Sequence, residues 1–250
     1  MSKIAVSVVI VTKDEAGNIK DALESVRDFD DVVVVDAFSS DNTTEICREY
    51  TDRIYEHEWQ GFAAQKQTAI DYAKNDWVLI LDSDERVTTE LRDEIIEKIK
   101  VDAISGFYIP RKNFFLGKWI RHSGWWPDHT LRLFRKGVSA MEPRAVHEKV
   151  NVNGAVSHIN APFEHYTYRT LSEYIGKMQN YTSLSAEELE NKGLVQSFIS
   201  MIFSPIVVFI KMYLVRQGFR DGIHGLVLAV LYSFYTFLKY AKALERKGRI

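Results

Sequence analysis

Cysteine is the scarcest residue type in this 250-residue chain, which contains only Cys47. A single cysteine cannot form an internal disulfide, and this fits a reducing compartment. The formal net charge is −2, so no excess of positive charge favours nucleic acid as a partner, and any nucleotide bound here is expected to be small. The first apolar run, in MSKIAVSVVIVTKDE, is not followed by a small-residue cleavage site. We therefore expect a first strand and not a signal peptide, in a cytoplasmic protein.

Phosphate-binding glycine loops are also missing from the sequence. It contains neither G-x-G-x-x-G nor G-x-x-x-x-G-K-[ST], so neither a dinucleotide-binding fold nor a P-loop is supported. The chain has instead a hydrophobic content of 46%, which is enough to bury the core of one large domain, or of one domain with an appendage.

Strand and helix patterns alternate four times in the first hundred residues. The strands are apolar and mostly β-branched, as in a parallel sheet that is covered on both faces. We expect an α/β fold, in which right-handed crossovers place helices on both faces of a mostly parallel, twisted sheet. From about residue 106 the segments are shorter and rich in aromatics, which suits an antiparallel addition and binding loops. The expected strands are 6–11, 31–35, 53–57 and 77–81, and the expected helices are 18–28, 43–50, 63–73 and 88–100.

Acidic side chains follow three of these strands. Residues 12–15 (TKDE) follow the first strand, Asp36 the second, and Asp82 and Asp84 the fourth. In open parallel sheets, ligands lie beyond the carboxyl ends of the strands. We therefore expect these acids to gather at one edge of the sheet, where Asp36 can accept a hydrogen bond from a base or a ribose.

Asp82 and Asp84 are two residues apart, so an extended backbone would project both carboxylates to the same side. Two such charges raise each other's pKa unless a cation lies between them. Mg²⁺ or Mn²⁺, held by one or two carboxylates and by substrate phosphates, resolves this conflict. The alternative is that the acids only solvate a loop and favour the N-terminus of the next helix, for which Thr88 is the expected cap.

Four stretches at the start of the chain resemble the family 2 glycosyltransferases: VSVVIVTKDEAGNI, VVVVDAFSSDNT, GFAAQKQTAIDYA and WVLILDSDE. The resemblance continues through RKNFFLGKWIRHSGWWPD, LRLFRKG, VHE and EHYTYR, covers roughly residues 4–245, and points to the lipopolysaccharide core β-1,4-glucosyltransferase subgroup. It implies the GT-A fold and the transfer of a sugar from a nucleotide diphosphate with inversion at the anomeric carbon.

The resemblance also implies roles for particular residues. Thr12, Glu15 and Asp36 would contact the nucleoside, and Asp82 and Asp84 would form the D-x-D that holds a divalent metal on the diphosphate. The sequence departs from the family pattern after Asp36, where Ala37 and Phe38 replace small residues, and at Gln67, where Asn is expected. The first departure puts the local turn in question, not the acid.

Inverting transfer needs a base that takes the proton of the acceptor hydroxyl. The candidates are Glu148, in VHE, and Asp128, in WWPD, and Glu148 is preferred because it matches the late acidic motif of the family. The alternative for Glu148 is a surface residue paired with Lys149. His165, in EHYTYR, resembles the histidine that completes the metal or diphosphate site; the alternative is a structural histidine.

Trp125 and Trp126 precede Asp128 and Arg132 in the sequence. We expect the two rings to stack on an acceptor sugar and Arg132 to bind its hydroxyls, while the alternative is that the aromatic pair belongs to the core.

The last part of the chain carries two strongly apolar stretches, 199–210 and 223–238, separated by RQGFR. Both are slightly short for a span of about 20 residues, and a spanning hairpin would carry two arginines outward. We expect residues 1–192 to form the catalytic domain and residues 193–250 an interfacial helical pair, peripheral on the cytoplasmic face of the inner membrane, with basic residues on anionic headgroups. The alternative is a buried hairpin or a dimer interface, so the oligomeric state stays open.

These expectations combine into a metal-dependent inverting glycosyltransferase, which moves glucose from UDP-glucose to a lipid-linked glycan such as lipopolysaccharide core. One rival transfers the sugar to polyprenyl phosphate. A second rival is an aspartyl-phosphate phosphohydrolase with Asp82 as nucleophile, although in those enzymes the motif follows the first strand. A third is a non-catalytic membrane scaffold.

Overall fold

The structure, a computed structural model, describes residues 3–142, 149–189 and 194–249. The chain forms two compact units. The first comprises residues 1–112 and 128–165, and the second residues 113–127 and 166–250. The expected boundary at residue 192 concerns function and stays a prediction.

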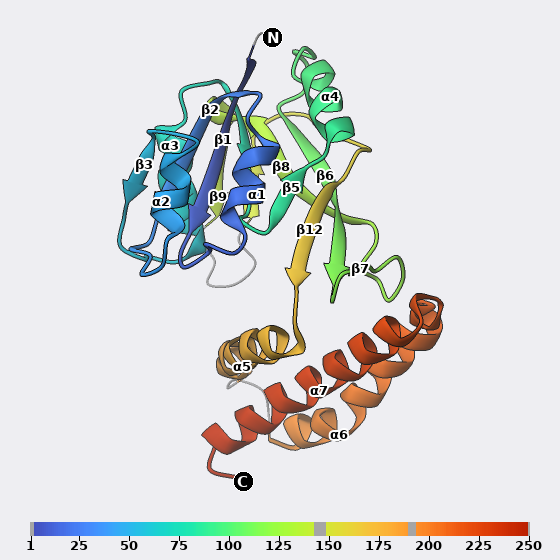
Figure 1. Cartoon of the computed structure of the whole chain (residues 1–250). Helices are drawn as coiled ribbons and strands as arrows, with labels where there is room; N and C mark the ends of the chain where they lie inside the picture. Colours follow the sequence, from blue (N-terminus) through green and yellow to red (C-terminus); the bar gives the residue numbers. More distant parts are fainter. Residues whose placement is uncertain (1–2, 143–148, 190–193, 250) are drawn as a thin grey trace. The chain divides into compact units, whose positions relative to one another are not determined.

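The first unit begins with the alternation that the sequence predicts (Figure 1). Each expected strand and helix of the first hundred residues is present, with ends that differ by a few residues. The elements are β1 (Ile4–Thr12), α1 (Ile19–Ser25), β2 (Phe29–Asp36), α2 (Thr43–Arg48), β3 (Ile54–Glu56), α3 (Phe62–Tyr72), β4 (Trp77–Ile80), β5 (Glu85–Val87) and α4 (Thr89–Lys98).

The later part of the chain adds mainly antiparallel strands and then helices. The strands are β6 (Gly106–Phe115), β7 (Lys118–Trp119), β8 (Asp128–Arg135), β9 (Ser139–Glu142), β10 (Lys149–Val152), β11 (Val156–His158) and β12 (Phe163–Tyr168), with a short 3-10 turn, η1 (Lys136–Val138), before β9. The helices are α5 (Leu171–Glu188), α6 (Leu194–Ile210), the π-helical turn η2 (Lys211–Val215), the 3-10 turn η3 (Gly218–Asp221) and α7 (Ile223–Arg246).

The main sheet runs in the order β3-β2-β1-β4-β8-β6-β12-β5, with β7 and β11 paired to β6. Strands β3, β2, β1 and β4 are parallel to one another. Strand β8 then pairs antiparallel with both β4 and β6. Because β1 lies between β2 and β4, the carboxyl ends of these three strands are neighbours at one edge.

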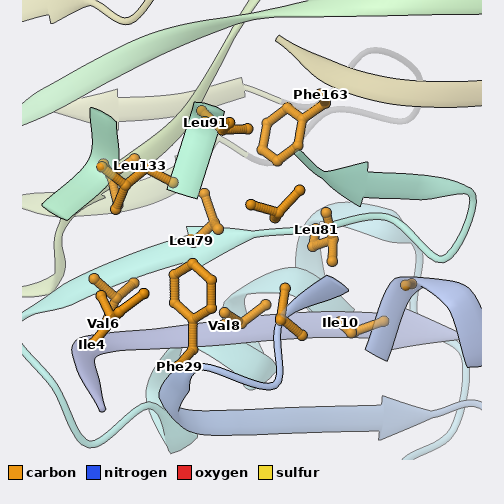
Figure 2. Close-up of a cluster of buried hydrophobic side chains, with 14 of the residues drawn as sticks. Ile4, Val6, Val8, Ile10, Phe29, Leu79, Leu81, Leu91, Leu133 and Phe163 are labelled. Atoms are coloured by element: carbon orange, nitrogen blue, oxygen red, sulfur yellow. The ribbon is translucent and has the colours of Figure 1, made fainter. Parts of the chain in front are cut away.

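The core of the first unit lies on both faces of this sheet. Successive side chains of a strand point to opposite faces, and Val8 and Val9 of β1 accordingly join different clusters. One cluster packs β1 and β4 against α1, α2 and α4, and Figure 2 shows part of it, with Ile10, Leu81 and Leu91 among the labelled side chains. The other packs the strands against α3. The expected helices on both faces are therefore confirmed.

The backbone at residues 82–84 is not extended, so the geometry that would project both carboxylates to the same side is not present. The amide of Glu85 donates to the carbonyl of Asp82 at 2.9 Å, which closes a turn. The turn leads directly into β5, a strand that the sequence patterns did not predict and that pairs antiparallel with β12. Thr88 caps α4 as predicted, because its hydroxyl accepts from the amide of Leu91 at 3.1 Å.

Candidate functional site

The loops after β1 and β2 are bound to each other by hydrogen bonds. The amide of Asp14 donates to Ser39 Oγ at 2.8 Å, and the amide of Ser40 donates to Asp14 Oδ1 at 2.7 Å. The amide of Glu15 donates to Thr43 Oγ1 at 2.8 Å. The sequence predicted that these loops share an edge of the sheet, and the contacts place them there.

Asp36 is fully buried at the end of β2. Its Oδ2 accepts from the amide of Ser39 at 2.7 Å, and its Oδ1 from the Ser39 hydroxyl. Phe38 lies between them with φ +56° and an exposed ring. The unusual residues after Asp36 therefore build a left-handed turn that the acid itself stabilises.

Thr12 and Glu15 lie at the end of β1 and in the loop after it. Thr12 is buried, and among the described residues its Oγ1 has no hydrogen-bond partner. Glu15 is half-buried and its Oε2 accepts from Asn18 Nδ2 at 2.8 Å. A buried hydroxyl without a partner destabilises the folded protein. A ligand that formed a hydrogen bond with Thr12 would remove this destabilisation.

Asp82 lies between two cations. The Nζ of Lys66, from α3, is 3.0 Å from Asp82 Oδ1, and the guanidinium of Arg132, from β8, pairs with Oδ2. Lys66 and Arg132 are both buried. Burial acts to raise the pKa of Asp82, but the charges and hydrogen bonds of Arg132 and Lys66 outweigh it and hold that pKa well below its usual value. Asp82 is therefore a half-buried carboxylate that stays ionised.

Glu85 links Asp82 to a further ion pair. It is fully buried, its Oε1 lies 3.1 Å from Arg132 Nη2 and 3.7 Å from Arg111 Nη1, and its Oε2 accepts from the Asp82 amide at 3.0 Å. Arg111 in turn pairs with Asp128 Oδ2 at 2.7 Å. The cluster thus balances three basic side chains against three acidic ones, which is how buried charges are tolerated.

Lys66, Glu85 and Arg111 were not among the site residues predicted from sequence. The sequence around them does not indicate a site. Lys66 lies inside GFAAQKQTAIDYA with no recognisable motif around it, and Arg111 belongs to a strand. Lys66 lies on α3, Glu85 on β5 and Arg111 on β6, and only the folded chain brings them together around Asp82 and Arg132.

Asp84 lies beside His165. The pairing of β5 with β12 sets His165 opposite Glu85, and His165 Nε2 lies 3.4 Å from Asp84 Oδ2. A carboxylate oxygen and an imidazole nitrogen at this separation are two suitable ligands for a divalent ion. Within the described residues no group of three or more His, Cys, Asp or Glu side chains converges. The residues therefore fit an ion that takes its remaining ligands from a substrate diphosphate, as Mg²⁺ commonly does.

The other predicted residues have different surroundings. Glu148 lies outside the described residues. Arg132 was expected to bind the acceptor, but its guanidinium forms ion pairs with Asp82 and Glu85. Trp125 lies in the second unit and packs edge-on against Phe115 at 6.1 Å and Tyr232 at 6.3 Å.

Trp126 also lies in the second unit and is half-buried. Its ring meets Trp119 edge-on at 5.4 Å, and the guanidinium of Arg121 lies 4.1 Å from the Trp119 centroid. The aromatic contacts of Trp125 are those expected of a core residue, while binding of a sugar by either tryptophan stays a prediction.

Comparison with known proteins adds a family match. The model of the family described as Glycosyl transferase family 2 matches residues 7–170. The lipopolysaccharide core biosynthesis glycosyltransferase LpsC of Rhizobium meliloti is 28% identical, over 98% of this chain and 93% of that protein. A glycosyltransferase of Rickettsia bellii is 29% identical, over 96% of this chain and 86% of that protein.

Two solved structures share the fold at low sequence identity. TarS 1-349 of S. aureus, in complex with UDP, has a TM-score of 0.51 and 17% identity, over 97% of this chain and 91% of that chain. The mannosyltransferase PcManGT of Pyrobaculum calidifontis, in complex with GDP-Man and Mn²⁺, has a TM-score of 0.50 and 15% identity, over 98% of this chain and 75% of that chain. The predicted GT-A-like fold is confirmed.

Proposed function

Because the chain belongs to glycosyl transferase family 2, and is therefore a glycosyltransferase, we propose that it moves glucose from UDP-glucose to a lipid-linked glycan of the lipopolysaccharide core kind. The transfer inverts the anomeric carbon and requires Mg²⁺ or Mn²⁺. The observation that carries this proposal is the placement of Asp36 and Asp82 after the parallel strands β2 and β4, on either side of β1, with Asp84 beside His165. The name of LpsC supports the acceptor class.

The nucleoside would bind to the loops after β1 and β2. Thr12 would donate or accept through its hydroxyl, which has no partner among the described residues. Asp36 and Glu15 would accept from the base or the ribose. The hydrogen bonds between the two loops would keep these groups in place before the donor arrives, which lowers the cost of binding.

The diphosphate would bind beside Asp84 and His165. These two residues would hold the metal, which would supply positive charge to the diphosphate leaving group. Asp82 would stay in the donor site as an ionised carboxylate, because Lys66 and Arg132 hold its pKa low. We propose that Arg132 positions Asp82 through this ion pair.

Glu148 is the proposed base. The competing candidate, Asp128, has its Oδ2 engaged by Arg111, which donates through Nε at 3.0 Å and pairs through Nη2 at 2.7 Å. This engagement favours a structural task for Asp128. A polyprenyl phosphate acceptor would need no base, so the choice of acceptor and the importance of Glu148 are linked.

The lipid-linked acceptor places the reaction at the cytoplasmic face of the inner membrane. Among the residues that the structure describes, two helices are long and apolar enough to cross a membrane by length and composition, which is weak evidence on its own: Phe198–Val215 and Ile223–Arg246. Their exposed apolar side chains support contact with a membrane surface.

A donor screen tests the proposed function without an acceptor. UDP-, GDP- and TDP-sugars are incubated with the protein and Mn²⁺, and release of the nucleotide diphosphate is measured. We expect hydrolysis of a UDP-sugar that stops when EDTA is added. Equal release with and without the metal, or release from none of the sugars, would contradict the proposal.

A further inference from the structure

We propose that α6 and α7, with the turn of residues 211–222 between them, form a monotopic surface that binds an anionic lipid bilayer, with both helices lying along one leaflet and neither crossing it. This inference specifies how the protein would contact the membrane, and its biological role rests on the proposed function. The binding itself is a separate physical property of the second unit.

The first observation is a continuous apolar face on α6 and the turn. No Asp, Glu, Lys or Arg occurs from residue 193 to 210. Large apolar side chains are exposed at spacings of three and four residues, which places them on one side of the helix. They are Phe198, Ile199, Ile202, Phe203, Ile206, Val207, Ile210 and Leu214.

Helix α7 lies beside α6 in the second unit (Figure 1) and also exposes large apolar side chains. Its exposed apolar residues also recur on one side of the helix, at Ile223, Val230, Phe234 and Phe237. Two neighbouring helices therefore expose apolar side chains along most of their length. A surface of this kind marks an interaction site.

The charges at the ends of the helices indicate what covers this surface. The turn carries Lys211, Arg216 and Arg220, all exposed, while its only acid, Asp221, is buried. The other end of α7 is also mainly basic: Lys239, Lys242, Arg246, Lys247 and Arg249 lie there with Glu245, and Glu187 of α5 pairs with Arg246 at 2.9 Å. Apolar helices with cations at both ends match an anionic leaflet, to which each cation near the surface adds attraction.

A second copy of the chain fits this surface less well. If two copies met side by side, basic turn would face basic turn. If they met head to tail, the basic turn would face the basic end of α7. Either arrangement brings like charges together, which disfavours association.

The turn is fastened to the loop of residues 118–123, which belongs to the same unit. Asp221 accepts from the amides of Arg121 at 3.3 Å and His122 at 2.8 Å, and its Oδ1 lies 3.1 Å from His122 Nδ1. Lys118 Nζ donates to the Asp221 carbonyl at 2.7 Å.

A second set of contacts lies next to these. The amide of Ser123 donates to the carbonyl of Arg216 at 2.9 Å. Gly218 packs so closely on Ser123 that a Cβ added to it would come within 2.4 Å of the serine Oγ. The loop and the turn are therefore one structural feature.

This attachment excludes a spanning hairpin. In such a hairpin the turn would lie on the far side of a hydrocarbon core about 30 Å thick. The five peptide steps from Ser123 to Asp128 can reach at most about 18 Å. Asp128 begins β8, the strand that carries the buried Arg132. The turn and β8 must therefore lie on the same side of the membrane, and the helices must run along the leaflet.

One consequence concerns the acceptor. The loop fastened to the turn continues into Trp125 and Trp126, so binding of the turn to a bilayer would hold this part of the chain close to the membrane surface. A lipid-linked acceptor is confined to that surface.

Vesicle flotation of the full chain tests the lipid partner. We expect the protein to float with vesicles of about three parts phosphatidylcholine and one part phosphatidylglycerol, and less with phosphatidylcholine alone or at about 0.5 M NaCl. Val215→Asp, at a turn residue that is 71% exposed, should lower binding about tenfold. The matched control Val101→Asp, at a 44% exposed valine of the first unit, should bind like the wild type. Melting temperatures of both variants establish that they are folded.

Cysteine labelling tests the orientation. Arg220→Cys places a thiol on the exposed turn, and the native Cys47 contributes little background because burial raises the pKa of its thiol to about 12. We expect a membrane-impermeant maleimide to label the variant in inverted inner-membrane vesicles and not in intact spheroplasts. A matched Val101→Cys variant should label in the same way.

Several results would overturn the proposal. Labelling of Arg220→Cys only from spheroplasts would show a spanning hairpin. Absence of binding to anionic vesicles, or lipid-independent dimers by light scattering that Val215→Asp dissociates, would show that lipid is not the partner. None of these assays contains a sugar nucleotide, so their failure leaves the proposed transferase activity intact, and failure of the donor screen leaves the lipid proposal intact.

Discussion

Lys66 Nζ lies 3.0 Å from Asp82 Oδ1, although α3 and the end of β4 are separate elements in the sequence. Arg132 holds the other oxygen of the same carboxylate. Asp82 is therefore kept ionised by two buried cations, while Asp84 stands beside His165. The two acids of D-S-D have different surroundings, and we expect different consequences when each is changed.

Removal of the Lys66 charge should weaken the donor site. Lys66→Met keeps much of the apolar stem and removes the ammonium, which leaves Asp82 with one cation instead of two. We expect kcat/KM for the sugar nucleotide to fall about 100-fold, the cost of losing one preorganised charged group in an active site. The control is Lys100→Met, which removes an exposed lysine that forms an ion pair with Glu97. This variant should leave kcat/KM unchanged. Equal activity of the two variants would contradict a role for Lys66.

Substitution of Glu85 should lower the stability of the folded protein. Glu85→Gln leaves Arg132 and Arg111 facing a neutral amide in a buried position. Breaking a buried ion pair costs about 3–5 kcal/mol, so the free energy of unfolding by urea should fall by an amount of this order. Glu97→Gln, at an exposed glutamate, serves as the control and should change it by less than about 0.5 kcal/mol. A small effect at Glu85 would show that the cluster does not stabilise the fold.

The ion pairs of Asp82 should appear in the pH dependence of stability. Its folded pKa is lowered, so its stabilising contribution is complete above the unfolded pKa of about 3.9 and is lost as the pH falls through the folded pKa. Wild type should therefore be more stable than Asp82→Asn at pH 7, and the difference should shrink as the pH falls below about 4. For Asp102→Asn, at a fully exposed carboxylate, we expect a difference near zero at each pH. A constant difference for Asp82→Asn would contradict the lowered pKa.

The identity of the acceptor should decide the effect of Glu148→Gln. With a hydroxyl acceptor, loss of the base should lower kcat by about 100-fold or more, while donor hydrolysis in the absence of acceptor should show whether the donor site is intact. Asp128→Asn is the matched comparison and should affect stability more than kcat. If Glu148→Gln retained near wild-type transfer, a polyprenyl phosphate acceptor would be favoured and the proposed hydroxyl acceptor contradicted.

Much of the parallel part of the fold was predictable, because its strands are continuous β-branched runs and its helices have recognisable starts such as Thr88. The convergence of acids at one edge was also predictable, because the carboxyl ends of parallel strands are neighbours. The turn after Asp82 was not, because β5 is only three residues long and exists through its pairing with β12.

The ion cluster was beyond sequence reasoning for another reason. Arg111, Arg132 and Lys66 come from β6, β8 and α3, and each resembles an ordinary strand or helix residue when considered alone. Their grouping depends on the antiparallel pairing of β4 with β8 and of β8 with β6, and nothing in the local sequence specifies that order.

The most direct test of the central claim is a crystal grown with UDP and Mn²⁺, measured with X-rays near the manganese absorption edge. The claim is that Asp84 and His165 hold a metal on the diphosphate at the carboxyl edge of the sheet. We predict an anomalous peak within about 2.5 Å of an Asp84 carboxylate oxygen, with UDP phosphate oxygens on its other side and Asp82 still paired with Lys66 and Arg132. UDP bound at this edge with no manganese peak beside Asp84, or UDP bound elsewhere, would contradict the account.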